Sequence, residues 1–441
     1  MMKKTKIPFV IMAVISIAAA FIPVQISGTG EGIVPADVAW ILSATGLVFL
    51  MTPGLSFFYG GMVRRKNIIS TILQSFVCLG VITIIYFLVG FSLCFGDSIG
   101  GVIGNPATFF FLKDVGLDVH PDLSPTVPLL LFALFQLKFA IITPALITGS
   151  FAERVNFKAY VLFISLFTIF IYSPLAHMTW HPSGIFRNWG VLDFAGGTVV
   201  HMSAGYAALA GAIFLGRRKE FEKGKHHEPV NIPYVMLGTG MLWFGWFGFN
   251  GGSALGANAT AVQAFGTTMA ASASAMIAWM FFEIMKGNKP SAMGACIAAV
   301  VGLVAITPAC AFVTVPQSVF IGFAAAIVSN WAVKFKNKSN LDDTLDVFPC
   351  HGLGGIVGML LTAVFAKDVG LIHGETSTFL FHLLVLVIVT IFTFFGSYLL
   401  FKITDFIIPM RVTAEAEADG LDYSQHGERY KPKRRVEAYL E

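Results

Sequence analysis

The sequence predicts an all-α integral membrane protein with eleven transmembrane helices after a signal peptide. Of the 441 residues, 56% are hydrophobic and only 12% are charged, and the mean hydropathy is +0.76. A soluble domain carries roughly 25% charged residues, so the composition excludes that class. A further observation, the alternation of basic and non-basic loops along the chain, gives the predicted topology.

The N-terminal segment has basic residues, then a short apolar stretch, then small residues. This order is typical of a secretory signal peptide, which we assign to residues 1–27 and expect to be cleaved. The alternative is a first helix that the mature protein retains. Residues 28–406 then form the membrane domain, and residues 407–441 form a cytoplasmic tail.

Eleven apolar spans follow, each near the roughly 20 residues that a helix needs to cross a bilayer. Their predicted bounds are 36–60, 68–95, 126–151, 157–176, 194–215, 230–250, 258–285, 291–307, 314–334, 346–366 and 377–406. The five cysteines lie in or next to these spans without a CxxC pair, so we expect them to be small packing residues.

The loops between the spans alternate in basic charge. Lys and Arg concentrate after odd-numbered spans, at 64–66, 154–158, 217–225, 286–289 and 334–338. The loops after even-numbered spans carry only Lys113, Arg187 and Lys367. Basic loops stay on the cytoplasmic side, so we expect a multi-pass protein of the inner membrane, with an outside N-terminus and a cytoplasmic C-terminus.

Eleven spans suggest an inverted repeat of five plus five helices, followed by one peripheral helix. The fifth span contains Asp193 and His201, and the tenth contains Asp346 and His351, each histidine among glycines. The acid-to-histidine spacings, eight and five residues, do not match, so this symmetry is only suggested.

Ionisable side chains inside a membrane usually face a partner or an aqueous path. His201 and His351 occupy corresponding places in the two proposed repeats, and glycines beside them would allow close helix approach. We expect the two imidazoles to hydrogen-bond, line a narrow path and relay a proton. The alternative is two separate packed histidines, each bonded to a backbone carbonyl.

Aromatic residues gather near the predicted outer ends of several spans. Trp180, Phe139 and Ser253 together would hold a small cation by ring faces and one hydroxyl. The alternative is an interfacial aromatic belt combined with ordinary packing, which the sequence alone favours for most of these rings.

Seven long motifs follow one another along the chain: PGLSFFYGGMVRRKN, FAERVNFKAY, LDFAGGTVVHMSAG, GWFGFNGGSALGAN, GACIAAVVGLVAITPACAFV, DVFPCHGLGGIVG and GLDYSQHGERY. With these motifs the chain resembles the ammonium transporter (Amt/Mep/Rh) family, closest to the bacterial and archaeal Amt branch, over residues of about 36 to 430. The motifs occur in collinear order, and their number and length make the resemblance very specific.

The resemblance implies a homotrimer of ammonium transporters in which each subunit has its own narrow, hydrophobic pore. It assigns an external ammonium site to Trp180, Phe135 and Ser253, and a phenylalanine gate to Phe139 and Phe249. It assigns the pore-lining pair to His201 and His351, and a structural role to Asp193. It also implies regulation by a cytoplasmic PII-type signal protein, with the segment ADGLDYSQHGERY coupling the subunits.

Ammonium and K⁺ have similar sizes, but only ammonium has transferable protons. An apolar pore is prohibitive for a bare cation and not for ammonia. We therefore expect ammonium, or methylammonium as its analogue, to lose a proton below the gate and cross as ammonia. Transport is electrogenic if the proton follows through the histidines and neutral if the proton returns; the sequence leaves both open.

Lys138 departs from the family pattern, which has a small or neutral residue there. Its side chain would contact another helix or subunit, extend to the outer surface, or enter the pore entrance. The last case predicts a weakly conducting or non-conducting ammonium sensor that signals through a cytoplasmic partner. His181 would alter ammonium recruitment, or it is simply a histidine of a surface loop.

No motif indicates an enzyme, a metal site, a cofactor or a nucleic-acid partner. A carbon dioxide channel, as suggested for Rh relatives, is weaker, because Trp180 and Ser253 resemble the Amt branch. The last basic cluster, Lys431, Lys433, Arg434 and Arg435, would touch anionic membrane lipid or remain a solvated tail.

Overall fold

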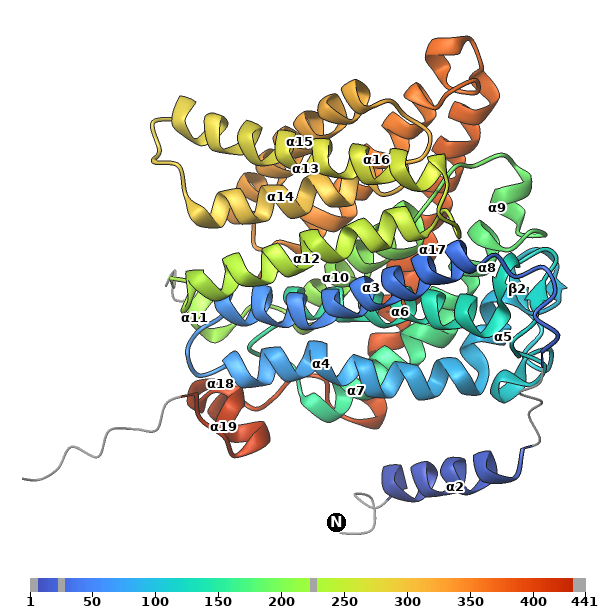
Figure 1. Ribbon diagram of the computed structural model, residues 1–441. Coiled ribbons are helices and arrows are strands. Elements are labelled where there is room, and N and C mark those ends of the chain that lie inside the picture. The colour runs from blue at the N-terminus through green and yellow to red at the C-terminus, as the bar shows by residue number, and fades with distance from the viewer. Residues whose placement is uncertain (1–6, 23–27, 223–227, 431–441) are drawn as a thin grey trace, which may run out of the picture.

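The computed structural model describes residues 7–22, 28–222 and 228–430. Residues 28–222 and 228–430 form a bundle of long, roughly parallel and antiparallel helices (Figure 1). The long helices are α3 (Pro35–Met62), α4 (Ile68–Ile85), α6 (Leu129–Ile147), α7 (Phe157–Phe167), α10 (Ser203–Leu215), α12 (Ile232–Gly252), α13 (Ala259–Met285), α14 (Ala292–Ile306), α15 (Val315–Lys338), α16 (Leu353–Phe365) and α17 (Thr376–Ile407). The shorter helices are α2 (Ile7–Phe21), α5 (Phe91–Phe95), α8 (Ser173–Trp180), α9 (Ile185–Asn188), α11 (Lys219–Glu222), α18 (Ala414–Asp419) and α19 (Leu421–His426).

Several helices are joined end to end by tighter or wider turns. The π-helical segments are η1 (Tyr86–Gly90), η4 (Thr168–Tyr172), η5 (Gly197–Met202) and η6 (Phe348–Gly352). The 3₁₀ segments are η2 (Phe110–Leu112), η3 (Thr148–Ser150) and η7 (Leu371–His373). Through these joints the short segments form four continuous rods. Two rods have three parts, α4–η1–α5 and α7–η4–α8, and two have two parts, η5–α10 and η6–α16.

Each of the eleven predicted spans contains one helix or rod, with ends that differ from the prediction by a few residues. Nine of them, among the described residues, are long and apolar enough to cross a membrane. The other two are α12, with 21 residues, and α14, with 15. The all-α membrane class is therefore confirmed, while the count of eleven crossings remains a prediction.

The two ends of the bundle carry different structures. Two short hairpins lie at one end with α9: β1 (Ser98–Ile99) with β2 (Ile103–Gly104), and β3 (Val119–His120) with β4 (Ser124–Pro128). The basic loops, α11 and the C-terminal α18 and α19 lie at the opposite end (Figure 1). This separation agrees with the predicted loop alternation.

Buried charges hold the basic end together. Arg218 donates to Glu153 at 2.7 Å and to Asp342 at 2.9 Å, and Arg64 donates to the same Glu153 at 2.9 Å. Each carboxylate is buried, so its charge needs these guanidinium partners. The network fixes the loop that leads into η6.

The C-terminal segment docks on this end. Asp422 accepts a hydrogen bond from the amide of Ser70 in the first turn of α4 at 2.8 Å. Asn67 accepts from the amide of Leu421 at 2.8 Å, and Lys66 donates to the carbonyl of Ala418 at 2.6 Å. A carboxylate at a helix N-terminus satisfies free amides and favours the helix dipole.

The predicted signal peptide corresponds to α2, which lies apart from the bundle and has no buried residue. Its cleavage stays a prediction, and residues 1–6 and 23–27 lie outside the described residues. The basic cluster Lys431, Lys433, Arg434 and Arg435 also lies outside them. All five cysteines are buried and free, as expected of packing residues.

Candidate functional site

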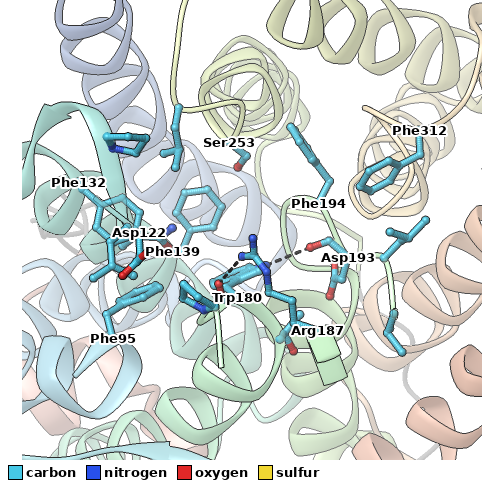
Figure 2. Close-up of a pocket in the computed structure, with 18 of the residues that line it drawn as sticks. Phe95, Asp122, Phe132, Phe139, Trp180, Arg187, Asp193, Phe194, Ser253 and Phe312 are labelled. Atoms are coloured by element: carbon cyan, nitrogen blue, oxygen red, sulfur yellow. Dashed lines mark hydrogen bonds between the residues drawn. The ribbon is translucent and has the colours of Figure 1, made fainter. Parts of the chain in front are cut away.

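A cavity of about 420 Å³ opens at the predicted outer end of the bundle, where the hairpins and α9 lie. Trp180, Phe139 and Ser253 line it, together with Asp193 (Figure 2). These side chains come from α8, α6, the end of α12 and the loop before η5. The structure thus brings together three predicted site residues that are far apart in sequence. We call this cavity the outer vestibule.

Two polar groups of the outer vestibule already donate hydrogen bonds within the protein. The indole N–H of Trp180 donates to the carbonyl of Asp193 at 3.0 Å, so the ring offers only its π surface. The hydroxyl of Ser253 donates to the carbonyl of Phe249 at 2.8 Å. Its oxygen therefore keeps lone pairs that accept N–H donors, which suits ammonium and gives K⁺ no directional bond.

Two phenylalanine rings close the inner side of the vestibule. The rings of Phe139 and Phe249 stack with centroids 4.2 Å apart and planes 29° apart, and both are buried. Trp180 meets Phe139 edge-on at 5.8 Å. This stacked arrangement is the one expected of the predicted gate.

Phe135 lies one helical turn before Phe139 on α6, with ring centroids 5.0 Å apart. It is fully buried and is not among the residues that line the outer vestibule. Its predicted contact with the substrate therefore stays untested, and in this structure it supports Phe139 from behind.

The histidine pair lies directly below the gate. The rings of His201 and Phe249 are stacked at 6.1 Å, and His201 also stacks on Trp246 at 5.4 Å. Nδ1 of His351 lies 3.4 Å from Nδ1 of His201. Both histidines are buried, and their imidazoles lie in contact although 150 residues separate them in the sequence.

Thr307 determines which nitrogen carries each proton. Its hydroxyl donates to the carbonyl of Leu303 at 2.8 Å, so its oxygen can only accept from other groups. It accepts from Nε1 of Trp246 at 2.9 Å and faces Nε2 of His201 at 3.3 Å. Neutral His201 then carries its proton on Nε2, and His351 donates from Nδ1. The free lone pair of the histidine pair is on Nε2 of His351.

Each histidine sits in a π-helical segment, His201 in η5 and His351 in η6. Such segments widen a helix locally and are frequent at functional sites. A cavity of about 10 Å³, about the space of one water molecule, adjoins His351 beyond the pair. The path beyond the pair is therefore narrow.

Glycines let the two segments cross. A Cβ on Gly205 would overlap the backbone of Gly352 in η6. A Cβ on Gly355 would lie 3.0 Å from the carbonyl oxygen of Gly197 in η5. Gly205 and Gly355 each follow their own histidine by four residues, so each packs against the segment that holds the other histidine. An inverted repeat produces this reciprocity.

Asp193 begins the first of these segments. One carboxylate oxygen accepts from the amides of Gly196 and Gly197 at 2.9 and 2.6 Å, and the other accepts from the amide of Thr198 at 2.8 Å. A carboxylate in this position satisfies amides that the helix leaves free. This geometry suits the structural role that the resemblance assigns to Asp193.

The equivalent acid of the second segment is Asp343, and the pairing of Asp193 with Asp346 was wrong. Asp343 accepts from the amides of Val347 and Phe348 at 3.2 and 2.8 Å. It precedes His351 by eight residues, as Asp193 precedes His201. Asp346 instead pairs with Lys336. The acid-to-histidine spacing is therefore eight residues in both segments.

Lys138 lies over the ring of Phe49 on α3, with Nζ 5.4 Å from the centroid. It is not among the residues that line the outer vestibule. This position agrees with the first predicted alternative, contact with another helix. His181 stacks on His177 at 4.3 Å and does not line the vestibule either.

Thr307 and Asp343 are not among the predicted site residues. Thr307 lies inside one of the family motifs, but one threonine in an apolar run gives no signal of its own. Asp343 had a signal, because counting eight residues back from His351 reaches it.

The apolar helices and the buried column of rings and imidazoles define a multi-pass membrane transport protein. The profile of the Ammonium Transporter Family matches residues 39–431. An ammonium transporter of Aquifex aeolicus is 44% identical and is aligned over 89% of this chain and 92% of its own. The chain belongs to the Ammonium Transporter Family, and it transports ammonium or ammonia across a membrane.

Solved structures agree with this assignment. The crystal structure of Candida albicans Mep2 has a TM-score of 0.83 and 32% identity, and the match covers 88% of this chain and 89% of that one. A structure described as a sensor Amt protein has a TM-score of 0.82 and 31% identity, covering 89% of this chain and 98% of that one.

Proposed function

We propose that ammonium binds in the outer vestibule at Trp180 and Ser253, passes the gate of Phe139 and Phe249, and is deprotonated at the histidine pair. Ammonia then crosses the apolar path, and the proton follows it inward from the histidine pair through His351. The observation that carries this proposal is the unbroken column from Trp180 to the imidazoles, with the Nδ1–Nδ1 distance of 3.4 Å at its inner end.

Desolvation supplies the selectivity. A bare cation in an apolar, low-dielectric path is disfavoured by tens of kcal/mol in the idealised case, whereas neutral ammonia has no such penalty. Ammonium can change from one form to the other by losing a proton, and K⁺ cannot. The gate then needs only to exclude the hydrated cation.

The histidine pair gives the proton a place to go. Nε2 of His351, whose ring adjoins the cavity beyond the pair, accepts the proton, and the Nδ1–Nδ1 contact with His201 stabilises the added charge. The proton then leaves His351 on the side away from the gate. Transport is then electrogenic. The second candidate, neutral ammonia conduction with the proton returning outside, predicts uptake without current.

Replacing both histidines by Leu tests the relay. We expect ammonium-selective current in proteoliposomes to be lost, because no other group of the column accepts a proton near neutral pH. His382→Gln, at a buried histidine outside the column, is the control for folding. Unchanged selective current in the double variant would rule out the relay.

We also propose a homotrimer in the inner membrane, with the N-terminus outside, residues 1–27 removed and residues 407–441 cytoplasmic. The resemblance to the family and the docked C-terminal helices support a site for a PII-type partner at the basic end. A non-conducting sensor is less well supported, because Lys138 lies away from the vestibule and the curated relatives are named as transporters.

A further inference from the structure

We propose that the basic ends of α13 and α15 form a binding site for an anionic phospholipid. Lys286 and Lys334 would hold its phosphate, and an apolar groove beside them would hold an acyl chain. α13 and α15 pack side by side in the upper group of helices in Figure 1, away from the outer vestibule. The proposal goes beyond the transport mechanism and does not depend on it.

Two ammonium groups converge on one aromatic ring. Nζ of Lys286 lies 3.4 Å from the centroid of Phe282, and Nζ of Lys334 lies 5.2 Å from the same centroid. Burial and the adjacent charge of Lys334 lower the pKa of Lys286 to about 8. Neither lysine has an ion pair within the part of the chain that the structure describes. An anion between them would remove their repulsion.

The apolar groove begins next to this lysine pair. Its volume is about 480 Å³, and its walls include Trp331 and Phe335 of α15 and Leu353 of α16. Trp331 is 52% exposed and Phe335 is 75% exposed. The rings of Trp331 and Phe282 are 6.5 Å apart, so the groove and the lysine pair form one continuous surface.

An amphiphile with a negative head matches this surface better than other occupants. Lysines and Trp at the end of an apolar helix lie at the level of lipid head groups, where each lysine attracts anionic lipid. The remaining lysine of the groove, Lys336, is already paired with Asp346. Free phosphate would leave the groove empty, and an acidic peptide would leave Trp331 and Phe335 exposed.

The opposite wall of the groove belongs to η6. Phe348 and Pro349 line it, and the same segment carries His351. A lipid seated there touches the segment that positions one pore histidine. Lipid composition would thereby influence the pore without any contact with the substrate.

Trp331 makes the site directly testable in the full-length protein. In nanodiscs, we expect brominated phosphatidylglycerol to quench the Trp331 signal at about tenfold lower mole fraction than brominated phosphatidylcholine. The Trp331 signal is the difference between wild type and Trp331→Phe. The variant Lys286→Ala/Lys334→Ala should lose this preference.

The matched control is Lys289→Ala/Lys402→Ala, which removes two other lysines of the basic end and should keep the preference. Lys402 contacts a single ring, Tyr398, at 5.3 Å. Equal quenching by the two lipids in wild type would overturn the proposal. Competition by inorganic phosphate would show a simple anion site, and protection of Trp331 only in an oligomer would show that a second copy covers the groove; either result overturns it.

Discussion

At the scale of single residues, the proton positions of the pore depend on Thr307. Its one hydroxyl proton is used by the carbonyl of Leu303, so it accepts from both Trp246 and His201. That arrangement fixes the tautomer of His201 and, through it, the lone pair on His351. A residue with no charge therefore orients the proton relay.

Thr307→Val tests this role. We expect ammonium current to fall by on the order of tenfold, about 1.4 kcal/mol of barrier, because His201 loses its fixed tautomer. Two buried donors without acceptors should also lower stability by about 1–3 kcal/mol each. Current in proteoliposomes and thermal unfolding measure the two effects.

Thr362→Val is the matched control, because Thr362 is equally buried and bonds only to Gly358 of its own helix. It should leave the current unchanged. Equal currents in Thr307→Val and wild type would show that Thr307 does not orient the pair.

The sequence predicts much of this site. The expected proximity of His201 to His351 and of Trp180 to Phe139 is seen. Histidines are unusual in a membrane span, and Trp180 and Phe139 belong to the aromatic residues near the predicted outer ends of the spans. The placement of Phe135 behind the gate was not predictable, since four-residue spacing puts it on the same helix face as Phe139. Which of two neighbouring rings faces a cavity depends on the packing of other helices.

At the scale of elements, the decisive feature is the crossing of η5–α10 with η6–α16. Glycines four residues after each histidine bring each helix against the segment of the other. The sequence shows these glycines but not their partners, because no local pattern specifies which backbones meet. The π-helical form of η5 and η6 could not be predicted from the sequence either. A π-helical turn has one residue more than an α-helical turn, and no residue type marks the difference.

Gly205→Ala tests the crossing. Its Cβ would overlap the backbone of Gly352, so η6 must move and the Nδ1–Nδ1 contact must lengthen. We expect a loss of at least about 1–3 kcal/mol of stability and a strong loss of ammonium current. Gly80→Ala is the control, because no atom lies within 4 Å of its Cβ position and Ala is the better helix former. A fully active Gly205→Ala protein would contradict the crossing.

At the scale of the whole molecule, the alternation of basic loops predicts that these loops meet at one end of the bundle, and the described parts of them do so. The docking of α18 and α19 on α4 could not be predicted, because it depends on amides that only become free once α4 has formed. Asp422 is one of its polar links, and its hydrogen bond with Ser70 joins residues 352 positions apart in the chain.

Asp422→Ala should release α18 and α19 from the bundle. Loss of the carboxylate leaves the first amides of α4 without an acceptor, which weakens the contact by about 1 kcal/mol. Hydrogen exchange of residues 414–426 should therefore become faster than in wild type. Asp419→Ala, at an exposed position one turn away, should not change it. Unchanged exchange in Asp422→Ala would mean that other contacts hold the segment.

The central claim is that only a cation able to give up a proton crosses this pore. The most direct measurement is the transient current of the wild-type protein in proteoliposomes, with ammonium and then K⁺ applied at the same concentration. We predict a saturable current with ammonium and none with K⁺. A K⁺ current of similar size would contradict the claim, because it would show that intact cations pass the gate and the histidine pair.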